Sequence, residues 1–160
     1  MGMRQTKGFS LIELLIVVAI ILVIAAIAVP SFLRSRIVAN ESAAVGSLRT
    51  LNTAQISYGS AYPTVGYASS LGAMAGSSCN PPSSAGACLI DTALAGGVRS
   101  GYTFNLTGVT GTPGSTYQFI ASPTLSNYSG IRYFCSFADA VVRASVSSIA
   151  TCDATVPPQN

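Results

Sequence analysis

The ionisable side chains of this 160-residue chain are few, and their kinds limit the chemistry that it could perform. There is no histidine, so the chain has no Ser-His or Cys-His pair to activate a nucleophile, and most zinc sites are excluded. Five acidic residues lie far apart in the sequence: Glu13, Glu41, Asp91, Asp139 and Asp153. They form no carboxylate-rich loop of the kind that binds calcium. We therefore predict a protein that is not an enzyme, with no catalytic residue, no cofactor and no metal.

The four cysteines, Cys79, Cys88, Cys135 and Cys152, all follow the most apolar part of the chain. An even number of cysteines in an exported region indicates two disulfides, for which three connectivities are possible. Short local loops favour Cys79–Cys88 and Cys135–Cys152, each contributing on the order of 3 kcal/mol through chain entropy. The spacings differ from C-x-x-C, which disfavours a redox or zinc function.

Glu13 stands directly before sixteen uninterrupted apolar residues, Leu14 to Val29. With Phe9 to Ile12 the stretch has about twenty residues, roughly 30 Å as a helix, which matches the hydrocarbon thickness of a bilayer. Twelve Leu, Ile or Val residues, at roughly −0.3 to −0.6 kcal/mol each, outweigh a penalty of about 3 kcal/mol for one acid. We therefore expect residues 9–29, here called the apolar segment, to enter a membrane. The buried acid requires a cationic partner.

The residues Gly8-Phe-Ser-Leu-Ile-Glu-Leu resemble the processing site of type IV pilins and type II secretion pseudopilins, in particular of a bacterial type IVa-like prepilin. The resemblance covers residues 1 to about 60. It implies that a prepilin peptidase cuts between Gly8 and Phe9 and methylates the new amino terminus. It also implies that Glu13 meets the Phe9 ammonium of a neighbouring subunit during filament assembly, since a charge in an apolar core is tolerable only when paired. The alternative is local pairing of Glu13 with Arg4 or Lys7.

An ordinary secretory signal peptide is the competing interpretation of the same stretch, because it has a basic start, an apolar core and a small-residue exit at residues 26–28. Its apolar core, however, exceeds the usual length of about 7–15 residues and contains Glu13. A helical pattern follows, where a released protein would have a polar linker. Charge does not set the orientation, because Arg34 and Arg36 balance Arg4 and Lys7. Export of the carboxyl side rests on the cysteines and the resemblance.

Pro30 ends the apolar run and predicts a kink or local opening, because it lacks an N–H and its ring clashes with the Ala26 carbonyl. In similar pilins the stretch before this proline loses helical structure inside the filament, which here corresponds to Leu22 to Pro30. A helical pattern resumes from Ser31 to about Tyr58, and Gly59 is expected to stop it. An apolar stripe of Leu33, Ile37, Ala44, Leu48 and Leu51 faces away from Arg34, Asn40, Ser47 and Asn52.

Residues 60–100 are loop-like, with one short helix expected at Leu89 to Leu94. After Arg99 apolar residues alternate, which predicts a strand around Tyr102 to Thr107, a turn over Gly108 to Ser115 and three further strands. These strands are Tyr117 to Ala121, Ile131 to Phe137 and Val141 to Val146. Short turns between them indicate an antiparallel meander that covers the helix. The expected class is α+β: a long N-terminal helix packed on a small antiparallel sheet, the pilin fold.

The expected domain organisation is a cleaved leader (1–8), a long helix (9–59, with 9–29 as membrane and assembly segment) and a globular head (60–160). Within the head we expect an αβ-loop (60–100), the sheet (101–148) and a tail loop (149–160). Net charge is +3, of which the leader supplies two, so no basic patch indicates nucleic acid.

The resemblance implies a major pilin, inserted in the bacterial inner membrane as a precursor and polymerised into an extracellular filament for adhesion, motility or DNA uptake. Its partners would be identical subunits, the prepilin peptidase and the inner-membrane assembly machinery. Processing and methylation would involve Gly8 and Phe9, and assembly would involve Phe9, Glu13 and Pro30. A type II secretion pseudopilin is the alternative within the family. A secreted binding module released by a conventional signal peptidase is the remote alternative.

Overall fold

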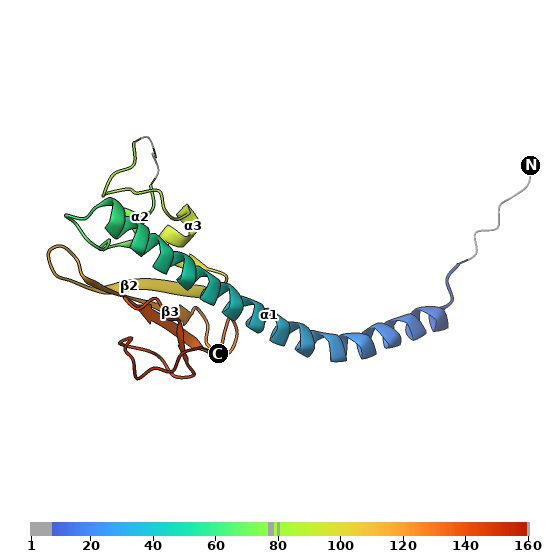
Figure 1. Ribbon diagram of the computed structural model, residues 1–160. Coiled ribbons are helices and arrows are strands. Elements are labelled where there is room, and N and C mark those ends of the chain that lie inside the picture. Colours follow the sequence, from blue (N-terminus) through green and yellow to red (C-terminus); the bar gives the residue numbers. More distant parts are fainter. Residues whose placement is uncertain (1–7, 77–78, 80, 160) are drawn as a thin grey trace, which may run out of the picture. The chain divides into compact units, whose positions relative to one another are not determined.

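The computed structural model describes residues 8–76, 79 and 81–159, so all of the expected leader except Gly8 lies outside the described residues. The chain divides into two units, one ending at Ser35 and the other beginning at Arg36. Helix α1, Leu11–Ala61, runs through both (Figure 1). Because the two units are not placed relative to one another, each is described by itself.

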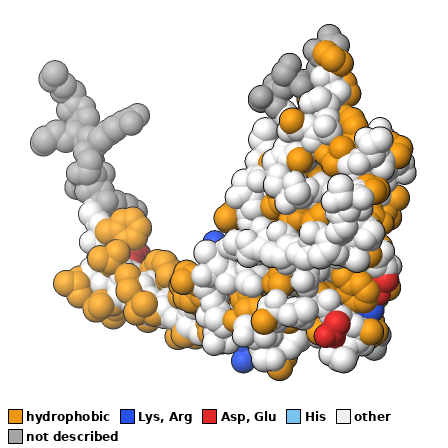
Figure 2. Space-filling model, turned by 90° about the vertical axis from the view of Figure 1, so that its left-hand side faces the viewer, with side chains coloured by type: hydrophobic (Ala, Val, Ile, Leu, Met, Phe, Trp, Pro, Cys, Tyr) orange, Lys and Arg blue, Asp and Glu red, His pale blue; other side chains and the backbone are white. Residues whose placement is uncertain are grey.

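The first unit is a helix whose apolar side chains are exposed. Every Leu, Ile and Val from residue 11 to residue 29 is accessible, from 45% at Val18 to 75% at Leu11. Figure 2 shows hydrophobic side chains covering the helical part of this unit. Within the described residues, α1 is the one helix long and apolar enough to cross a membrane by length and composition, with a mean hydropathy of 3.3 in its most apolar window.

Helix α1 continues through Pro30 without a break. Of the two predicted effects of Pro30, the local opening is absent from the single subunit, because the turns on either side remain helical although the Ala26 carbonyl has no N–H four residues on. The other predicted effect, a kink at Pro30, stays a prediction. The expected loss of helical structure from Leu22 to Pro30 concerns the filament and stays a prediction.

The second unit is an α+β head in which α1 packs on an antiparallel sheet (Figure 1). The sheet has the order β1-β2-β3-β4-β5, the meander predicted from the sequence. Its strands are β1 Val98–Arg99, β2 Tyr102–Thr110, β3 Thr116–Pro123, β4 Tyr133–Phe137 and β5 Arg143–Ser145. Two short helices, α2 Leu71–Met74 and α3 Thr92–Ala95, precede the sheet.

One face of the sheet is buried against α1, and part of the other face is covered by the tail. The face toward α1 carries large aromatic side chains that pack on Leu48, Leu51 and Tyr58 of the helix. These aromatic residues are Tyr102, Phe104, Tyr117, Phe119 and Phe134. On the other face, Ile120 packs with the disulfide-bonded Cys135 and Cys152 of the tail. The tail after β5 is thus a partial third layer, which the two-layer prediction did not include.

Several boundaries differ from those predicted. Helix α1 ends at Ala61, beyond Gly59, and β1 was not predicted. Strand β2 continues to Thr110, where a turn was expected from Gly108. The pairing with β3 shifts between Thr107 and Thr110, and Gly108 has a φ of +65°. The glycine marks a bulge inside the strand, a use that sequence alone does not separate from a turn.

The predicted outward face of α1 is wrong at Ser47 and Asn52, which are buried. The Asn52 amide Nδ2 donates to the Ala140 carbonyl at 3.3 Å, and its Oδ1 accepts from the Tyr117 hydroxyl at 3.3 Å and the Ser136 hydroxyl at 3.0 Å. A polar side chain is stable in a core when its donors and acceptors are satisfied. Asn52 therefore fixes the helix against the sheet.

Two other polar side chains of α1 bind backbone of the surrounding loops. Gln55 receives the Ala68 N–H at 2.8 Å and donates to the Ala68 carbonyl at 3.0 Å. Glu41, whose side chain is 7% exposed, accepts from the N–H groups of Ile131 and Arg132 at 2.9 and 3.1 Å and from the Arg132 guanidinium at 2.8 Å. Burial raises the pKa of Glu41, but these hydrogen bonds and the Arg132 charge together hold the pKa below its ordinary value of 4.5.

Asn52→Ala is expected to lower the free energy of unfolding by about 2–4 kcal/mol, because two buried hydroxyls lose their acceptor. The measurement is urea unfolding of the full chain in detergent micelles, followed by near-ultraviolet circular dichroism. Thr53→Ala is the control, because this exposed neighbour bonds only the Arg49 carbonyl of its own helix. A loss of the same size in both variants would contradict the role given to Asn52.

Glu41→Gln is expected to destabilise the head at pH 7 and to have a progressively smaller effect as the pH falls below 4.5. The lowered pKa means that the carboxylate contributes stability above the ordinary pKa, and that this contribution is lost as the pH falls through the lowered one. Unfolding of both proteins measured from pH 7 to pH 3 tests this. A constant difference at every pH would show that packing, rather than charge, is what the substitution removes.

Candidate processing and assembly site

The Gly8–Phe9 peptide lies in an exposed stretch without regular secondary structure, before α1 begins at Leu11. The side chain of Phe9 is 86% exposed, and among the described residues other than the chain neighbours of Gly8, no atom lies within 4 Å of where a Cβ on Gly8 would stand. A peptidase must bind its substrate in an extended form, and a bond outside regular structure is the easiest to reach. The geometry around Gly8 and Phe9 is therefore suited to cleavage, with no rearrangement of the helix required.

Glu13 has a partner within its own chain that the sequence analysis missed. The Ser10 backbone N–H donates to Glu13 Oε2 at 3.0 Å, and the Ser10 carbonyl accepts from the Leu14 N–H at 3.2 Å. Ser10 is thus the N-cap of α1, and Ser10-Leu-Ile-Glu13 is the S-x-x-E pattern of a capping box. That pattern was visible in the sequence and could have predicted the contact. Arg4 and Lys7, the alternative partners, lie outside the described residues.

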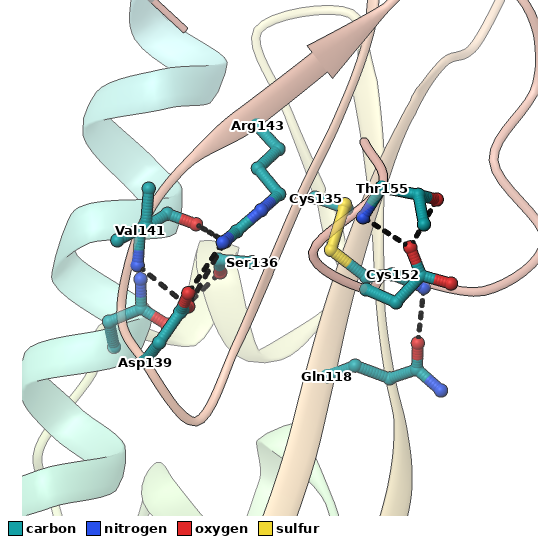
Figure 3. The surroundings of a disulfide bond; sticks show 10 residues. Gln118, Cys135, Ser136, Asp139, Val141, Arg143, Cys152 and Thr155 are labelled. Atoms are coloured by element: carbon teal, nitrogen blue, oxygen red, sulfur yellow. Dashed lines mark hydrogen bonds and ion pairs between the residues drawn. A yellow bond between two sulfur atoms is a disulfide. The ribbon is translucent and has the colours of Figure 1, made fainter. Parts of the chain in front are cut away.

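The remaining carboxylates of the head are dispersed, each with its own structural task. Asp91 caps α3 by accepting the Leu94 N–H at 2.7 Å and pairs with Arg99 at 2.8 Å. Asp139 pairs with Arg143 at 2.6 Å beside the turn into β5 (Figure 3). Within the ranges that the structure covers, no three His, Cys, Asp or Glu side chains gather in a group that could hold a metal ion.

Two disulfides close short loops, Cys79–Cys88 and Cys135–Cys152, with sequence separations of 9 and 17. The second is buried and joins β4 to the tail, where Gln118 Oε1 accepts the Cys152 N–H at 2.7 Å (Figure 3). The first lies between α2 and α3, where Cys79 is exposed and Cys88 is half-buried. Their surroundings indicate that the buried bond holds the sheet's outer layer in place.

Replacing Cys135 and Cys152 together by alanine is expected to lower the free energy of unfolding by about 3–5 kcal/mol, through lost chain entropy and lost burial. Residues 146–159 should then become sensitive to limited proteolysis, because the tail loses its covalent anchor. The matched variant replaces Cys79 and Cys88 by alanine, for which we expect a smaller loss of about 2–3 kcal/mol and an intact tail. Equal losses and equal tail cleavage would contradict the role given to the buried bond.

Comparison with known proteins places this site in a family. Residues 3–29 match the family described as the prokaryotic N-terminal methylation motif, which includes Gly8, Phe9 and Glu13. The chain is 48% identical over 54 residues to the type IV major pilin protein PilA of Myxococcus xanthus, which covers 34% of this chain and 24% of that protein. It is 55% identical over 40 residues to the type IV wide pilus major component PilA4 of Thermus thermophilus, covering 25% of this chain and 30% of that protein.

The matches thus span about a quarter to a third of the length of these relatives. No solved structure matches the chain. The features that meet in the first unit are an exposed Gly8–Phe9 bond outside regular secondary structure, a capped helix start with one acid and an exposed apolar helix, all within the matched motif. The chain therefore carries the prokaryotic N-terminal methylation motif and is a type IV pilin-like protein, distantly homologous to type IV major pilins.

Proposed function

We propose that this chain is the major subunit of a bacterial type IV pilus. It is inserted in the inner membrane as a precursor by residues 9–29, processed after Gly8 and polymerised into an extracellular filament. The observation that carries the proposal is the exposed apolar helix with its single acid inside the methylation motif. The leader (1–8), the apolar segment and the head (60–160) then have the separate tasks of processing, anchoring and display.

The membrane state of the precursor follows from the exposed side chains of the first unit. Because none of the Leu, Ile and Val side chains from residue 11 to residue 29 is buried, an isolated chain in water would leave them all hydrated. A bilayer removes this cost for about twenty helical residues. Lipid tails are as apolar as these side chains, so leaving the bilayer for a filament must be driven by packing and polar contacts between subunits.

Glu13 would supply the polar contact. In the uncut chain its carboxylate accepts the Ser10 N–H. Cleavage after Gly8 converts the Phe9 amide into an ammonium, and a neighbour's ammonium can then pair with Glu13 as the segments bundle. A buried carboxylate with a cationic partner is tolerable where an isolated one is not. The expected partners are prepilin peptidase, the inner-membrane assembly machinery and further copies of this chain. The filament would serve adhesion, motility or DNA uptake.

Amino-terminal analysis of the mature protein and electron microscopy of cells test the proposal together. We expect a chain that starts at methylated Phe9, and long fibres that disappear when this chain is deleted. A mature start near Val29 would indicate release by a conventional signal peptidase. A start at Phe9 without long fibres would indicate a pseudopilin of type II secretion.

The role of the charge is tested by comparing Glu13→Gln with Glu13→Ala. The glutamine keeps an oxygen that can accept the Ser10 N–H but removes the negative charge, whereas alanine removes both. We expect both variants to remain in the membrane and to reduce fibres at least about tenfold, because both lose the ion pair with Phe9. Asp153→Asn, a neutralised exposed acid of the head, is the control and should assemble normally. Normal fibres from Glu13→Gln with none from Glu13→Ala would show that the cap, and not the charge, is required.

A further inference from the structure

A groove of about 460 Å³ lies at the end of the head where α1 enters it. Arg36 and Asn40 of α1 form one side, and the loop after β3, from Thr124 to Ser129, forms the other. Val98 of β1 completes the lining, together with Ser100 and Gly101 of the turn before β2. All of these residues belong to the second unit, so the groove is a feature of the head by itself.

The loop that forms the groove is held in place by hydrogen bonds. Asn40 Nδ2 donates to the Ser129 carbonyl at 2.9 Å, and the Ser129 hydroxyl accepts the Leu125 N–H at 3.0 Å. Gly101 lies close beneath: a Cβ there, at a φ of +74°, would stand 2.8 Å from Ser129 Cβ. The groove is therefore preformed in the single chain.

The side chains that the groove presents to solvent are apolar and basic. Val98, Leu125 and Tyr128 are 54%, 62% and 65% exposed. Among the residues that the structure describes, no acidic side chain lines the groove. Three other arginines of the described head have carboxylate partners, namely Arg99 with Asp91, Arg132 with Glu41 and Arg143 with Asp139. Within the same described part of the chain, Arg36 forms no ion pair, so its charge is available to an anion.

We propose that this groove docks on the anionic phospholipid headgroups of the bilayer that holds the apolar segment. The inference rests on the proposed function for its membrane-inserted precursor. Arg36 stands seven positions after Val29 in α1, about 10 Å along the helix, which is comparable with the depth of the headgroup layer. Exposed tyrosine and arginine with an apolar neighbour are the side chains that favour this interface, and arginine is attracted by anionic lipid. The head would thus rest on the bilayer until assembly lifts it away.

The test is hydrogen–deuterium exchange of the full chain, one copy per lipid nanodisc, in phosphatidylcholine alone and with about a third of phosphatidylglycerol. We expect the amides of residues 124–129 to exchange at least about threefold more slowly in the anionic discs, and high salt to remove the difference. Arg36→Gln should abolish the protection. Arg49→Gln is the matched control and should retain the protection, because it removes an exposed arginine farther along α1 that forms no ion pair with any described residue.

Equal exchange in the two kinds of disc, or full protection in Arg36→Gln, would overturn the proposal. Protection of residues 124–129 that is independent of lipid charge but increases with the number of chains per disc would also overturn the proposal. It would indicate that a second copy of the chain occupies the groove. A chain that enters neither disc would overturn the membrane precursor of the proposed function as well. A chain that enters both discs with equal exchange overturns the lipid proposal alone.

Discussion

The structure depends on one constraint: the side chains of the apolar segment must be kept from water, and the chain itself does not cover them. All fourteen Leu, Ile and Val residues from 11 to 29 are exposed in the single subunit. The hydrophobic effect therefore acts between this segment and something outside the chain, a bilayer or further copies. A head that folds independently of that choice must have its own core, and the division of the chain at Arg36 is consistent with this.

In the head the same helix contributes polar contacts as well as apolar ones. Leu48, Leu51 and Tyr58 pack against the aromatic face of the sheet, but Glu41, Asn52 and Gln55 decide how the loops and strands lie around the helix. Each binds backbone or hydroxyl groups that would otherwise be buried without partners. Apolar packing tolerates sliding along a helix, whereas hydrogen bonds with fixed partners do not. These side chains thus define the register of helix against sheet.

The sequence was informative where a pattern has a single physical explanation. The period-two alternation from Tyr102 and the long apolar helix predicted the α+β fold correctly, because burial alone produces both patterns. It was misleading at Asn52 and Ser47, because a polar residue on a helix is normally exposed and its buried partners, Ala140 and Tyr117, are distant in the sequence. Gly108 was assigned to a turn because glycine serves turns and bulges equally. The tail layer over Ile120 depends on long-range contacts that no local pattern encodes.

The capping contact of Glu13 changes how its role should be understood. A carboxylate near the start of an apolar helix is stabilised by the free N–H groups there, so Glu13 satisfies local needs of the uncut chain before any neighbour is present. Under the proposed function, cleavage creates a full positive charge on Phe9, one residue before the N-cap. Two opposite charges then lie at the same end of every apolar segment, and neither can be buried alone. Bundles of segments in a register that pairs these charges are therefore favoured over bundles in which the charges are not paired. The acid would thus select the geometry of the filament as well as permit its formation.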